Sequence, residues 1–384
     1  MLSLMNTEVE AFQAIVISRL AHELKEQGRS IIHMEFGQPS TGAPRAAIAR
    51  AHEVLDSDGM GYWESPALRQ RLARYYLDSY GVTVEPERFI ITCGASPALL
   101  LALVAGFAAG DRVALARPGY VSYRNTLRAL HMIPMEIPCG PETRFQLTAA
   151  SLAALDPVPA GVIVASPANP TGTVIDAAEL KAIAAVCRER GIRILSDEIY
   201  HGLSYVEPAH SMLEFEPSTL VVNSFSKYFS MVGWRLGWFL APANLLQRAR
   251  AYGGNLFLSA PSLSQHAALV ALDSREELEG HVAVYRHNRS LLLAALPKLG
   301  LDVIAPPDGA FYVYASIRHL TDDSLAFCQS LLRDTGVATA PGIDFDPVDG
   351  RYFIRFSFAL ATADLEEGLR RMQPWFSAAA ARLR

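Results

Sequence analysis

Residues 161–200 read GVIVASPANPTGTVIDAAELKAIAAVCRERGIRILSDEIY, and this stretch decides the fold. Its two ends, GVIVASP and RILSDEIY, are apolar on both faces, as strands in a parallel sheet covered by helices must be. The residues between them predict a helix over 176–191, because Asp176 and Glu179 have capping-box spacing and Gly191 stands where a C-terminal glycine belongs. Alternation of this kind indicates an α/β domain with a mostly parallel sheet.

Further strand-like runs lie before and after this stretch, separated by helical segments. They occupy residues 88–94, 111–118, 219–226 and 235–242. From about residue 280 the pattern changes, and a helical stretch leads to the shorter strands FYVYASI and RYFIRFSFA and to a last helix from about residue 362. We therefore predict a large domain over residues 46–280 and a smaller α+β domain formed by residues 281–384 with the N-terminal arm, residues 1–45.

The composition is that of a compact globular protein. Of the 384 residues, 51% are hydrophobic and 19% are charged, and the formal net charge is −5. Basic residues are scattered without a run or a stripe, so we expect no nucleic-acid partner. The most apolar segment, residues 98–110, is too short to span a bilayer and predicts a buried helix. The N-terminus lacks the pattern of a signal peptide, so we expect no membrane association either.

The four cysteines give a further indication of the cellular setting. They are widely spaced and form no C-x-x-C motif, which argues against a disulfide framework and against a metal site. Buried reduced thiols in a cytoplasmic protein are the better interpretation. The cysteines are Cys93, Cys139, Cys187 and Cys328.

Residue types suited to chemistry follow the predicted strands, at the edge where open α/β sheets bind their ligands. In TCGASPALL, Ser96 is a candidate N-cap with Pro97 at the first helical position, which leaves the N–H groups of Ala95 and Ser96 free to hold an anion. A plain helix cap explains the same residues. In SPANPTG, Asn169 either closes a turn or is presented to a ligand by a stiff, proline-flanked platform.

Two other strand ends carry reactive side chains. Asp197 and Tyr200 can face one ligand, although an acidic residue in such a place is often a cap or a surface charge. In SFSKYFSMVGWRLGW, Ser224, Lys227 and Arg235 supply a hydroxyl, an amine and a fixed cation. Solvated loop charges are the alternative. The surrounding aromatic residues favour a region partly removed from water, where an amine has a depressed pKa and attacks carbonyls.

Together, a phosphate cradle, a carboxylate, a phenol, an amide, a lysine and an arginine are the groups that pyridoxal 5'-phosphate needs from a protein. The chain resembles the class I/II aminotransferases, the fold-type I family of enzymes that depend on this cofactor. The matching motifs, in the family's order, are NPTG, DEIY, SFSK…GWRLGW and FIRFSFA, and the resemblance runs from GQPS to the last helix. It implies a large domain with a mostly parallel seven-stranded sheet flanked by helices, beside the smaller α+β domain.

The resemblance implies a role for each residue around the cofactor. Lys227 forms the internal Schiff base and, once displaced, moves a proton between substrate and cofactor. Asp197 pairs with the pyridine nitrogen, while Tyr200 and Asn169 hydrogen-bond the phenolic oxygen of the ring. The groups that hold the phosphate are Ser224, Arg235 and the N–H groups of Ala95 and Ser96.

The same resemblance implies residues that contact the ring faces and the substrate. Tyr120 stacks on the cofactor ring, where an ordinary core tyrosine is the alternative, and Ile199 packs against its opposite face. Arg355 binds the α-carboxylate of the substrate, since a charge within so apolar a strand is otherwise costly. Gly37 and Asn169 line the same substrate pocket.

Tyr62 matches a tyrosine that reaches the phosphate of the neighbouring subunit, which implies a homodimer with shared active sites. The match is imperfect, because the family usually has a glycine between that tyrosine and the following LR pair, where this chain has Ser65 and no glycine. A second departure is Asp346 in PGIDFD, where a glycine is common. That loop borders the substrate pocket of the family, so we expect an unusual shape there.

Transamination from an L-amino acid to a 2-oxo acid is the reaction that we predict. A lyase acting at the β- or γ-position, such as a C–S lyase, shares the same constellation and remains an alternative. A pyridoxal-phosphate-sensing regulator would carry an N-terminal DNA-binding segment, yet only about thirty residues precede GQPS. A nicotinamide enzyme is disfavoured because no G-x-G-x-x-G follows a strand-like run.

One motif bears on the substrate. Some aspartate-specific relatives carry a lysine just after the glycine of the phosphate loop, where it holds a distal carboxylate, but GASPALL offers no cation. We therefore expect a neutral donor, aromatic or aliphatic, and a 2-oxo acid acceptor such as 2-oxoglutarate.

Overall fold

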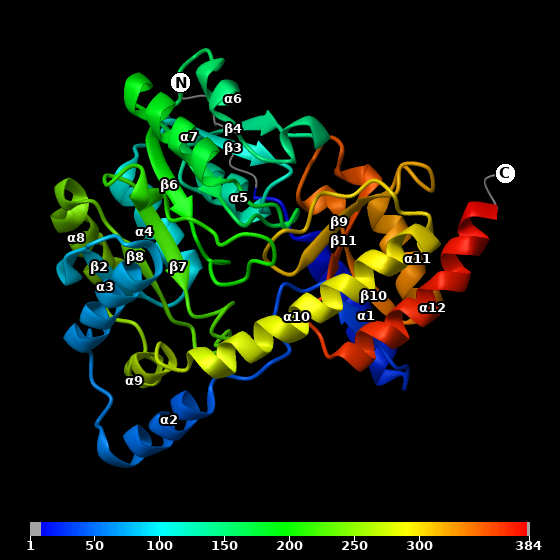
Figure 1. Ribbon diagram of the computed structural model, residues 1–384, viewed down its shortest axis with the longest axis horizontal. Coiled ribbons are helices and arrows are strands. Elements are labelled where there is room, and N and C mark those ends of the chain that lie inside the picture. Colours follow the sequence, from blue (N-terminus) through cyan, green and yellow to red (C-terminus); the bar gives the residue numbers. More distant parts are fainter. Residues whose placement is uncertain (1–8, 382–384) are drawn as a thin grey trace.

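The computed structural model describes residues 9–381 and contains two sheets, each with its own helices (Figure 1). The larger sheet has seven strands in the order β2-β8-β7-β6-β5-β3-β4, and all neighbours are parallel except that β8 is antiparallel to β2 and β7. The predicted seven-stranded, mostly parallel sheet is thus confirmed. Its strands are β2 (Phe89–Thr92), β3 (Arg112–Arg117), β4 (Ile133–Pro138), β5 (Gly161–Ala165), β6 (Arg193–Asp197), β7 (Leu220–Ser224) and β8 (Gly237–Leu240).

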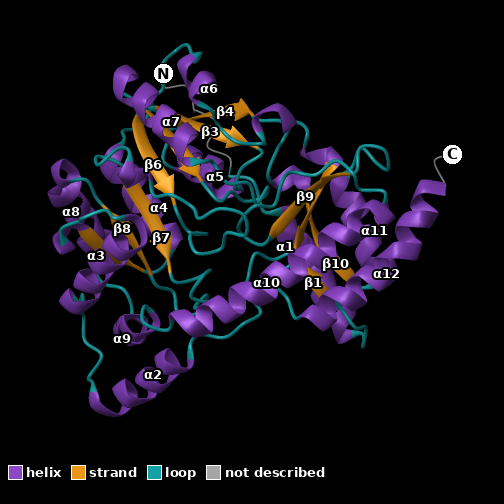
Figure 2. Ribbon diagram, viewed as in Figure 1, coloured by secondary structure: helices purple, strands orange, loops and turns teal. Residues whose placement is uncertain are grey.

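Helices cover both faces of this sheet (Figure 2). Successive residues of a strand point to opposite faces, so neighbouring residues of one strand pack against different helices. Ile163 of β5 packs in one cluster with residues of α4, α5 and α8, whereas its neighbour Val162 packs with residues of α6 and α7. Helix α7 confirms the helix predicted over 176–191, with Asp176 as its N-cap and Gly191 as its left-handed C-cap. The helices of this part are α2 (Arg45–Ser57), α3 (Pro66–Tyr80), α4 (Ala95–Gly106), α5 (Val121–Ala129), α6 (Ala149–Ala153), α7 (Ala177–Arg190), α8 (Leu246–Leu256) and α9 (Ser262–Ala271).

The smaller sheet has the order β1-β10-β11-β9. Strand β1 comes from the N-terminal arm and pairs in parallel with β10. Helix α10, yellow in Figure 1, runs from the large part to the small one. The elements are β1 (Ile32–Met34), β9 (Tyr312–Ser316), β10 (Val337–Pro341), β11 (Phe353–Ser357), α1 (Gln13–Glu26), α10 (Arg275–Ala295), α11 (Ser324–Thr335) and α12 (Thr362–Ala381). The domain boundaries at 45 and 280 remain a prediction.

Three strands have no counterpart among the predicted ones. β1 has only three residues, β4 contains two prolines, and β10 is built largely of alanine and threonine, so none shows a strong apolar run. The strands with which they pair are distant in sequence, and this pairing determines their extended conformation where the local sequence does not. Among residues 9–381, every helix is too short or too polar to cross a bilayer.

Candidate active site

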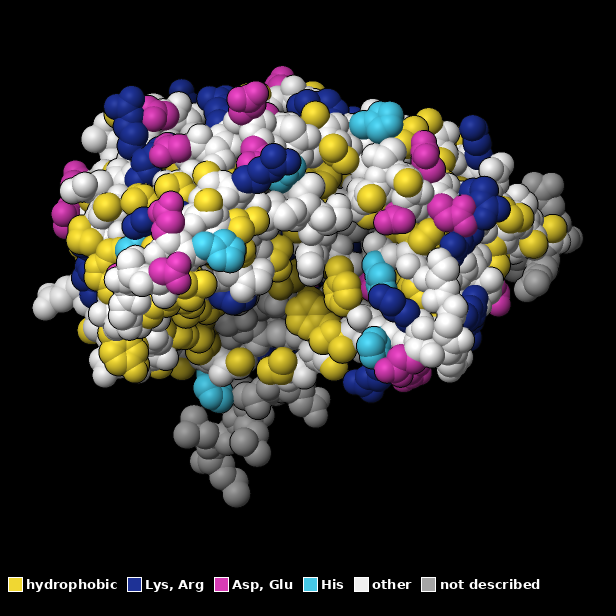
Figure 3. All heavy atoms as spheres, turned by 90° about the horizontal axis from the view of Figure 1, so that it is seen from below, with side chains coloured by type: hydrophobic (Ala, Val, Ile, Leu, Met, Phe, Trp, Pro, Cys, Tyr) yellow, Lys and Arg dark blue, Asp and Glu magenta, His cyan; other side chains and the backbone are white. Residues whose placement is uncertain are grey.

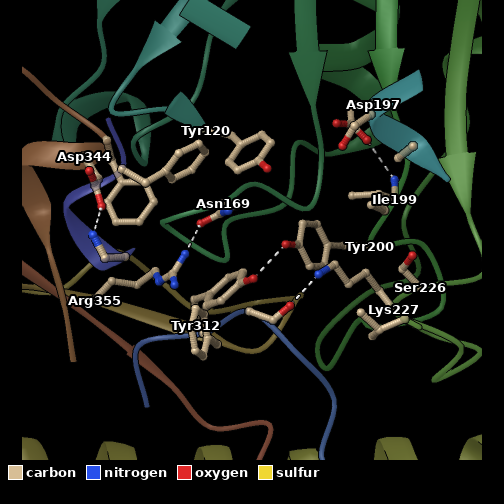
Figure 4. A pocket seen from close by; sticks show the side chains of 18 of the residues that line it. Tyr120, Asn169, Asp197, Ile199, Tyr200, Ser226, Lys227, Tyr312, Asp344 and Arg355 are labelled. Atoms are coloured by element: carbon tan, nitrogen blue, oxygen red, sulfur yellow. Dashed lines mark hydrogen bonds between the residues drawn. The ribbon is translucent and has the colours of Figure 1, made fainter. Parts of the chain in front are cut away.

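A cavity of about 350 Å³ lies at the C-terminal ends of the large-sheet strands, where the small domain and the N-terminal arm close over them (Figure 4). Eleven of the thirteen residues that the sequence predicts for the site line this cavity, although they come from widely separated segments. They are Gly37, Ala95, Ser96, Tyr120, Asn169, Asp197, Ile199, Tyr200, Lys227, Arg235 and Arg355. Ser224 and Tyr62 do not line it.

The amine of Lys227 lies inside the cavity, three residues beyond the end of β7. Its Nζ donates a hydrogen bond to the carbonyl oxygen of Gly37 and lies 5.8 Å from the centre of the Tyr200 ring. Desolvation lowers the pKa of Lys227 from 10.5 to about 8, with further lowering by the positive charges of Arg355 and Arg235. A substantial fraction of this amine is therefore unprotonated near neutral pH, as a nucleophile requires.

The carboxylate of Asp197 lies at the last residue of β6 and is held by two donors. Tyr123 donates its hydroxyl hydrogen to Oδ2 at 2.6 Å, and the N–H of Ile199 donates to Oδ1 at 3.1 Å. Burial raises the pKa of Asp197, while the Tyr123 hydrogen bond, the Ile199 N–H and the charge of Lys227 act in the opposite direction. Sequence reasoning missed Tyr123, although its spacing of three from Tyr120 in the sequence GYVSY would place both on one side of a helix.

A pair of tyrosine hydroxyls joins the two domains across the cavity. The hydroxyl oxygens of Tyr200 and Tyr312 lie 2.7 Å apart, and burial raises the pKa of both phenols. The ring of Tyr312 also lies 4.3 Å from the guanidinium carbon of Arg355. Tyr312 is a second residue of the cavity that sequence reasoning missed. Its strand also carries the hydroxyls of Tyr314 and Ser316, so the sequence gives no signal that singles out Tyr312.

The guanidinium of Arg355 lies between two aromatic rings, those of Tyr312 and Phe345, the second at 4.7 Å. Its Nη1 donates to the side-chain oxygen of Asn169 at 2.8 Å, and its Nη2 donates to the carbonyl oxygen of Glu35. Its Nε is buried and has no hydrogen-bond partner within residues 9–381. These contacts hold the cation in a mostly apolar setting at the cavity.

The other end of the cavity is formed by the N-terminus of α4. This helix begins at Ala95 with Gly94 as its N-cap, so the predicted cap at Ser96 is wrong. Gly94 takes this place because its φ of 102° suits glycine and because a Cβ there would come 2.5 Å from Nη2 of Arg235. The N–H groups of Ala95 and Ser96 nevertheless lie in the first turn, where no intrahelical acceptor exists, beside the guanidinium of Arg235.

Two predicted residues lie apart from this lining. Ser224 is buried, and its Oγ accepts the backbone N–H of Ser226 at 3.1 Å, while Ser226 itself lines the cavity. Tyr62 is 86% exposed and does not line the cavity of its own chain. The roles of Ser224 in phosphate binding and of Tyr62 in a neighbouring subunit remain predictions.

The loop of residues 341–346 anchors the arm over the cavity. The two carboxylate oxygens of Asp344 accept the N–H groups of Gln13 and Ala14 at 2.7 and 2.8 Å, which ties the start of α1 to this loop. Asp346 does not line the cavity, and its Oδ1 accepts the N–H groups of Val348 and Asp349. Its neighbour Phe345 lines the cavity.

The chain is similar to proteins whose names describe amino-group transfer. The family described as aminotransferase class I and II matches residues 29–372. A valine–pyruvate aminotransferase of Mycobacterium tuberculosis is 48% identical over 96% of each chain, and a (5-formylfuran-3-yl)methyl phosphate transaminase of Methanocaldococcus jannaschii is 32% identical over 98% of this chain and 100% of that one. Among solved structures, an aminotransferase of M. tuberculosis aligns with a TM-score of 0.95 at 47% identity, covering 98% of this chain and 99% of that one. The aspartate aminotransferase of Thermus thermophilus with maleate aligns with a TM-score of 0.90 at 30% identity, covering 97% and 100%.

Proposed function

The chain belongs to the class I and II aminotransferases, and from this membership we propose that it moves the amino group of a neutral L-amino acid to a 2-oxo acid with pyridoxal 5'-phosphate as cofactor. When bound, this cofactor supplies an electron sink that stabilises negative charge at the Cα of the amino acid. The observation that carries the proposal is that Lys227, with its lowered pKa, and Arg355 line one cavity. An amine suited to an aldehyde and a guanidinium suited to a carboxylate thus belong to the same site.

The residues of the cavity fit the cofactor in charge and in donor type. The N–H groups of Ala95 and Ser96 with Arg235 would hold its phosphate, because helix N-termini and guanidinium groups both favour anions. Asp197 would hold a proton on the ring nitrogen, and Asn169 and Tyr200 would donate to the ring oxygen.

Lys227 would both anchor the cofactor and transfer the proton of the substrate. Its pKa of about 8 lets one amine accept a proton from Cα and return it without a large energy difference near neutral pH. Arg355 would orient the amino acid by its α-carboxylate, since its planar fork is fixed by Asn169 and by two aromatic rings.

The wall of the cavity supports a neutral donor. Phe12, Ile15, Phe36 and Phe345 line it. The cations that the described residues contribute are Lys227, Arg235 and Arg355, which all have the tasks given above. A distal carboxylate therefore finds no partner on this wall, and branched aliphatic or aromatic side chains bury apolar area there. The 48% identical relative carries the name valine–pyruvate aminotransferase, so pyruvate joins 2-oxoglutarate as an acceptor to be tested.

A homodimer with shared active sites is also part of the proposal. Large apolar side chains that are 42–86% exposed gather on α2, on the segment after it and at the end of α8, namely Ile48, Leu55, Tyr62, Leu256 and Leu258. Figure 3 views the molecule from below and includes broad hydrophobic areas on this side. A contiguous exposed apolar patch is typical of an interface. Sedimentation of the holoenzyme would test whether the protein is a dimer. If Tyr62 reaches the phosphate of the neighbouring subunit, Tyr62→Phe should weaken cofactor binding and leave the dimer intact.

We further propose a cytoplasmic location, which the cysteines support. Cys139, Cys187 and Cys328 are buried free thiols, and burial raises the pKa of Cys139 to about 11 and those of the other two to about 12. Such thiols are inert and suit a reducing compartment.

The visible spectrum of the holoenzyme tests the reaction directly. Addition of valine should remove the absorption band of the lysine-bound cofactor, and addition of pyruvate or 2-oxoglutarate should restore it. Aspartate should act much more slowly than valine, leucine or phenylalanine. Release of ammonia and a 2-oxo acid from an amino acid with a β leaving group, with the band retained and no acceptor added, would favour a lyase instead.

A further inference from the structure

A buried polar network lies beneath the turn that carries Asp197 and Tyr200, on the side away from the cavity. Successive strand residues point to opposite faces, so Asp197 faces the cavity while Ser196 and Glu198 face the opposite way. The side chains of Glu198 and His201 are each 1% exposed, and neither lines the cavity. The proposed reaction uses neither of them, although buried polar groups need a compensating role.

Glu198 gathers donors from three separate segments. Its Oε1 accepts the hydroxyl hydrogens of Ser211 at 2.8 Å and Ser196 at 3.2 Å and the backbone N–H of Met212 at 3.1 Å. Its Oε2 accepts the hydroxyl of Tyr76, on α3, at 3.4 Å. Tyr76 in turn accepts the indole N–H of Trp238 on β8 at 3.2 Å. This one carboxyl group thereby connects β6, α3 and the segment after residue 210.

His201 connects the same turn to the loop that carries Asn169. Its Nε2 lies 3.0 Å from the carbonyl oxygen of Ser166, and a carbonyl only accepts, so Nε2 carries the hydrogen. Its Nδ1 then accepts the hydroxyl hydrogen of Tyr80 at 2.8 Å. Burial lowers the pKa of His201 to about 3, which keeps the ring neutral and this arrangement constant.

We propose that Glu198 and His201 are positioning residues of the active site, which fix the 197–201 turn to α3 and to the Ser166–Asn169 loop from behind. Asp197 ends strand β6 and is held by strand pairing, whereas Tyr200 and Asn169 lie on the segments that follow β6 and β5. Side-chain bonds between these segments therefore help to set the positions of the three groups relative to one another. A shift of about 1 Å between such groups is enough to lower a rate by about two orders of magnitude. The inference rests on the proposed function for its kinetic consequence, but the loop anchoring is a property of the protein alone.

Hydrogen–deuterium exchange of the holoenzyme reads this anchoring without reference to activity. In His201→Phe, which keeps a ring but removes both hydrogen bonds, amides of residues 166–172 and 197–203 should exchange about tenfold faster or more. In Glu198→Ala, the acceleration should be centred on 197–203 and 211–214. Glu198→Gln and His201→Gln retain acceptor or donor atoms in nearly the same places, and should stay within about threefold of the parent protein.

A second readout separates positioning from plain loss of stability. The visible band of the bound cofactor changes with pH, and the midpoint of that change depends on Asp197, Tyr200 and Asn169. The midpoint should shift in His201→Phe and Glu198→Ala. In the two glutamine variants it should be close to that of the parent protein. The matched control is Glu179→Ala, because Glu179 also accepts a backbone N–H, that of Ala149 at 2.6 Å, but does not line the cavity. It should lower the melting temperature and leave the band unchanged.

The outcomes are distinguishable. Faster exchange in the two loops with a moved band supports the inference, whereas a lower melting temperature with unchanged loop exchange and an unchanged band overturns it. If the alanine and phenylalanine variants do not fold, Tyr80→Phe removes only the hydroxyl that His201 accepts and should still accelerate exchange of residues 197–203. A parent protein that binds the cofactor without transaminating overturns the proposed function and leaves the exchange comparison valid.

Discussion

The hydroxyl of Tyr123 donates to Oδ2 of Asp197 at 2.6 Å, so the carboxylate at the end of β6 is held from α5 as well as from its own turn. This short, charge-assisted bond favours the ionised form of a buried carboxyl group whose pKa burial raises. In the proposed function, Tyr123 would therefore determine how well Asp197 holds a proton on a bound pyridine ring.

Tyr123→Phe should lower kcat about tenfold or more. A hydrogen bond to a charged group contributes about 1.5–3 kcal/mol, and its removal raises the pKa of Asp197 further. Single-turnover kinetics with valine would measure the change, with the visible band reporting cofactor occupancy. An unchanged kcat with full occupancy would show that the Ile199 N–H alone suffices to hold Asp197.

Arg355→Lys should raise KM for the amino acid by about 10- to 100-fold and affect kcat less. Lysine offers a point charge in place of the planar fork that Asn169 and the two aromatic rings orient, so it loses paired contacts worth about 1.5–3 kcal/mol. Arg351→Lys is the matched control, because Arg351 is an exposed arginine of the same segment and does not line the cavity. A fall in kcat at constant KM would contradict the assignment of the carboxylate to Arg355.

Capture of pyridoxal 5'-phosphate by the cofactor-free protein should depend on pH through Lys227. Only the unprotonated amine attacks an aldehyde, so the rate should rise about tenfold per pH unit up to about 8 and then level off. Stopped-flow absorbance from pH 6 to 9.5 would measure it. Arg355→Met removes a positive charge that lowers this pKa, and the midpoint should move to higher pH. A midpoint near the ordinary value of 10.5 would contradict the desolvated setting of the amine.

Much of this architecture can be predicted from local sequence. The strands β5 and β6 are mostly apolar runs, and α7 has an apolar stripe and a capping residue at each end. The strands β1, β4 and β10 lack such runs and acquire their conformation from partners, as Ile32 does opposite Val337. The helix start at Gly94 depends on the backbone conformation of that residue, since its φ of 102° is one that side chains other than that of glycine rarely adopt.

The site divides in the same way. Residues that follow strands, such as Asp197 and Lys227, can be recognised by position, because strand ends converge at one edge of a parallel sheet. Tyr312 and Tyr123 cannot be recognised in this way. Their roles arise from contacts across 112 and 74 positions of sequence, with Tyr200 and Asp197.

Tyr314→Phe should stabilise the protein, because its hydroxyl is buried without a hydrogen-bond partner in the described part of the chain. The side chain is 1% exposed, and its ring stacks on Phe353 at 4.7 Å with an interplanar angle of 5°, a contact that phenylalanine keeps. Removing a desolvated, unpaired hydroxyl should raise the free energy of unfolding by about 1 kcal/mol. Calorimetry of the holoenzyme should then give a melting temperature about 1–3 °C higher.

Tyr314→Leu is the contrasting variant, since it removes the ring as well and should destabilise by about 2–3 kcal/mol through the cavity left beside Phe353. Activity toward valine should be unchanged in Tyr314→Phe, because this side chain does not line the active-site cavity. A lower melting temperature in Tyr314→Phe would mean that the hydroxyl does have a partner, such as a buried water molecule. The polar group would then contribute to the stability of the small sheet.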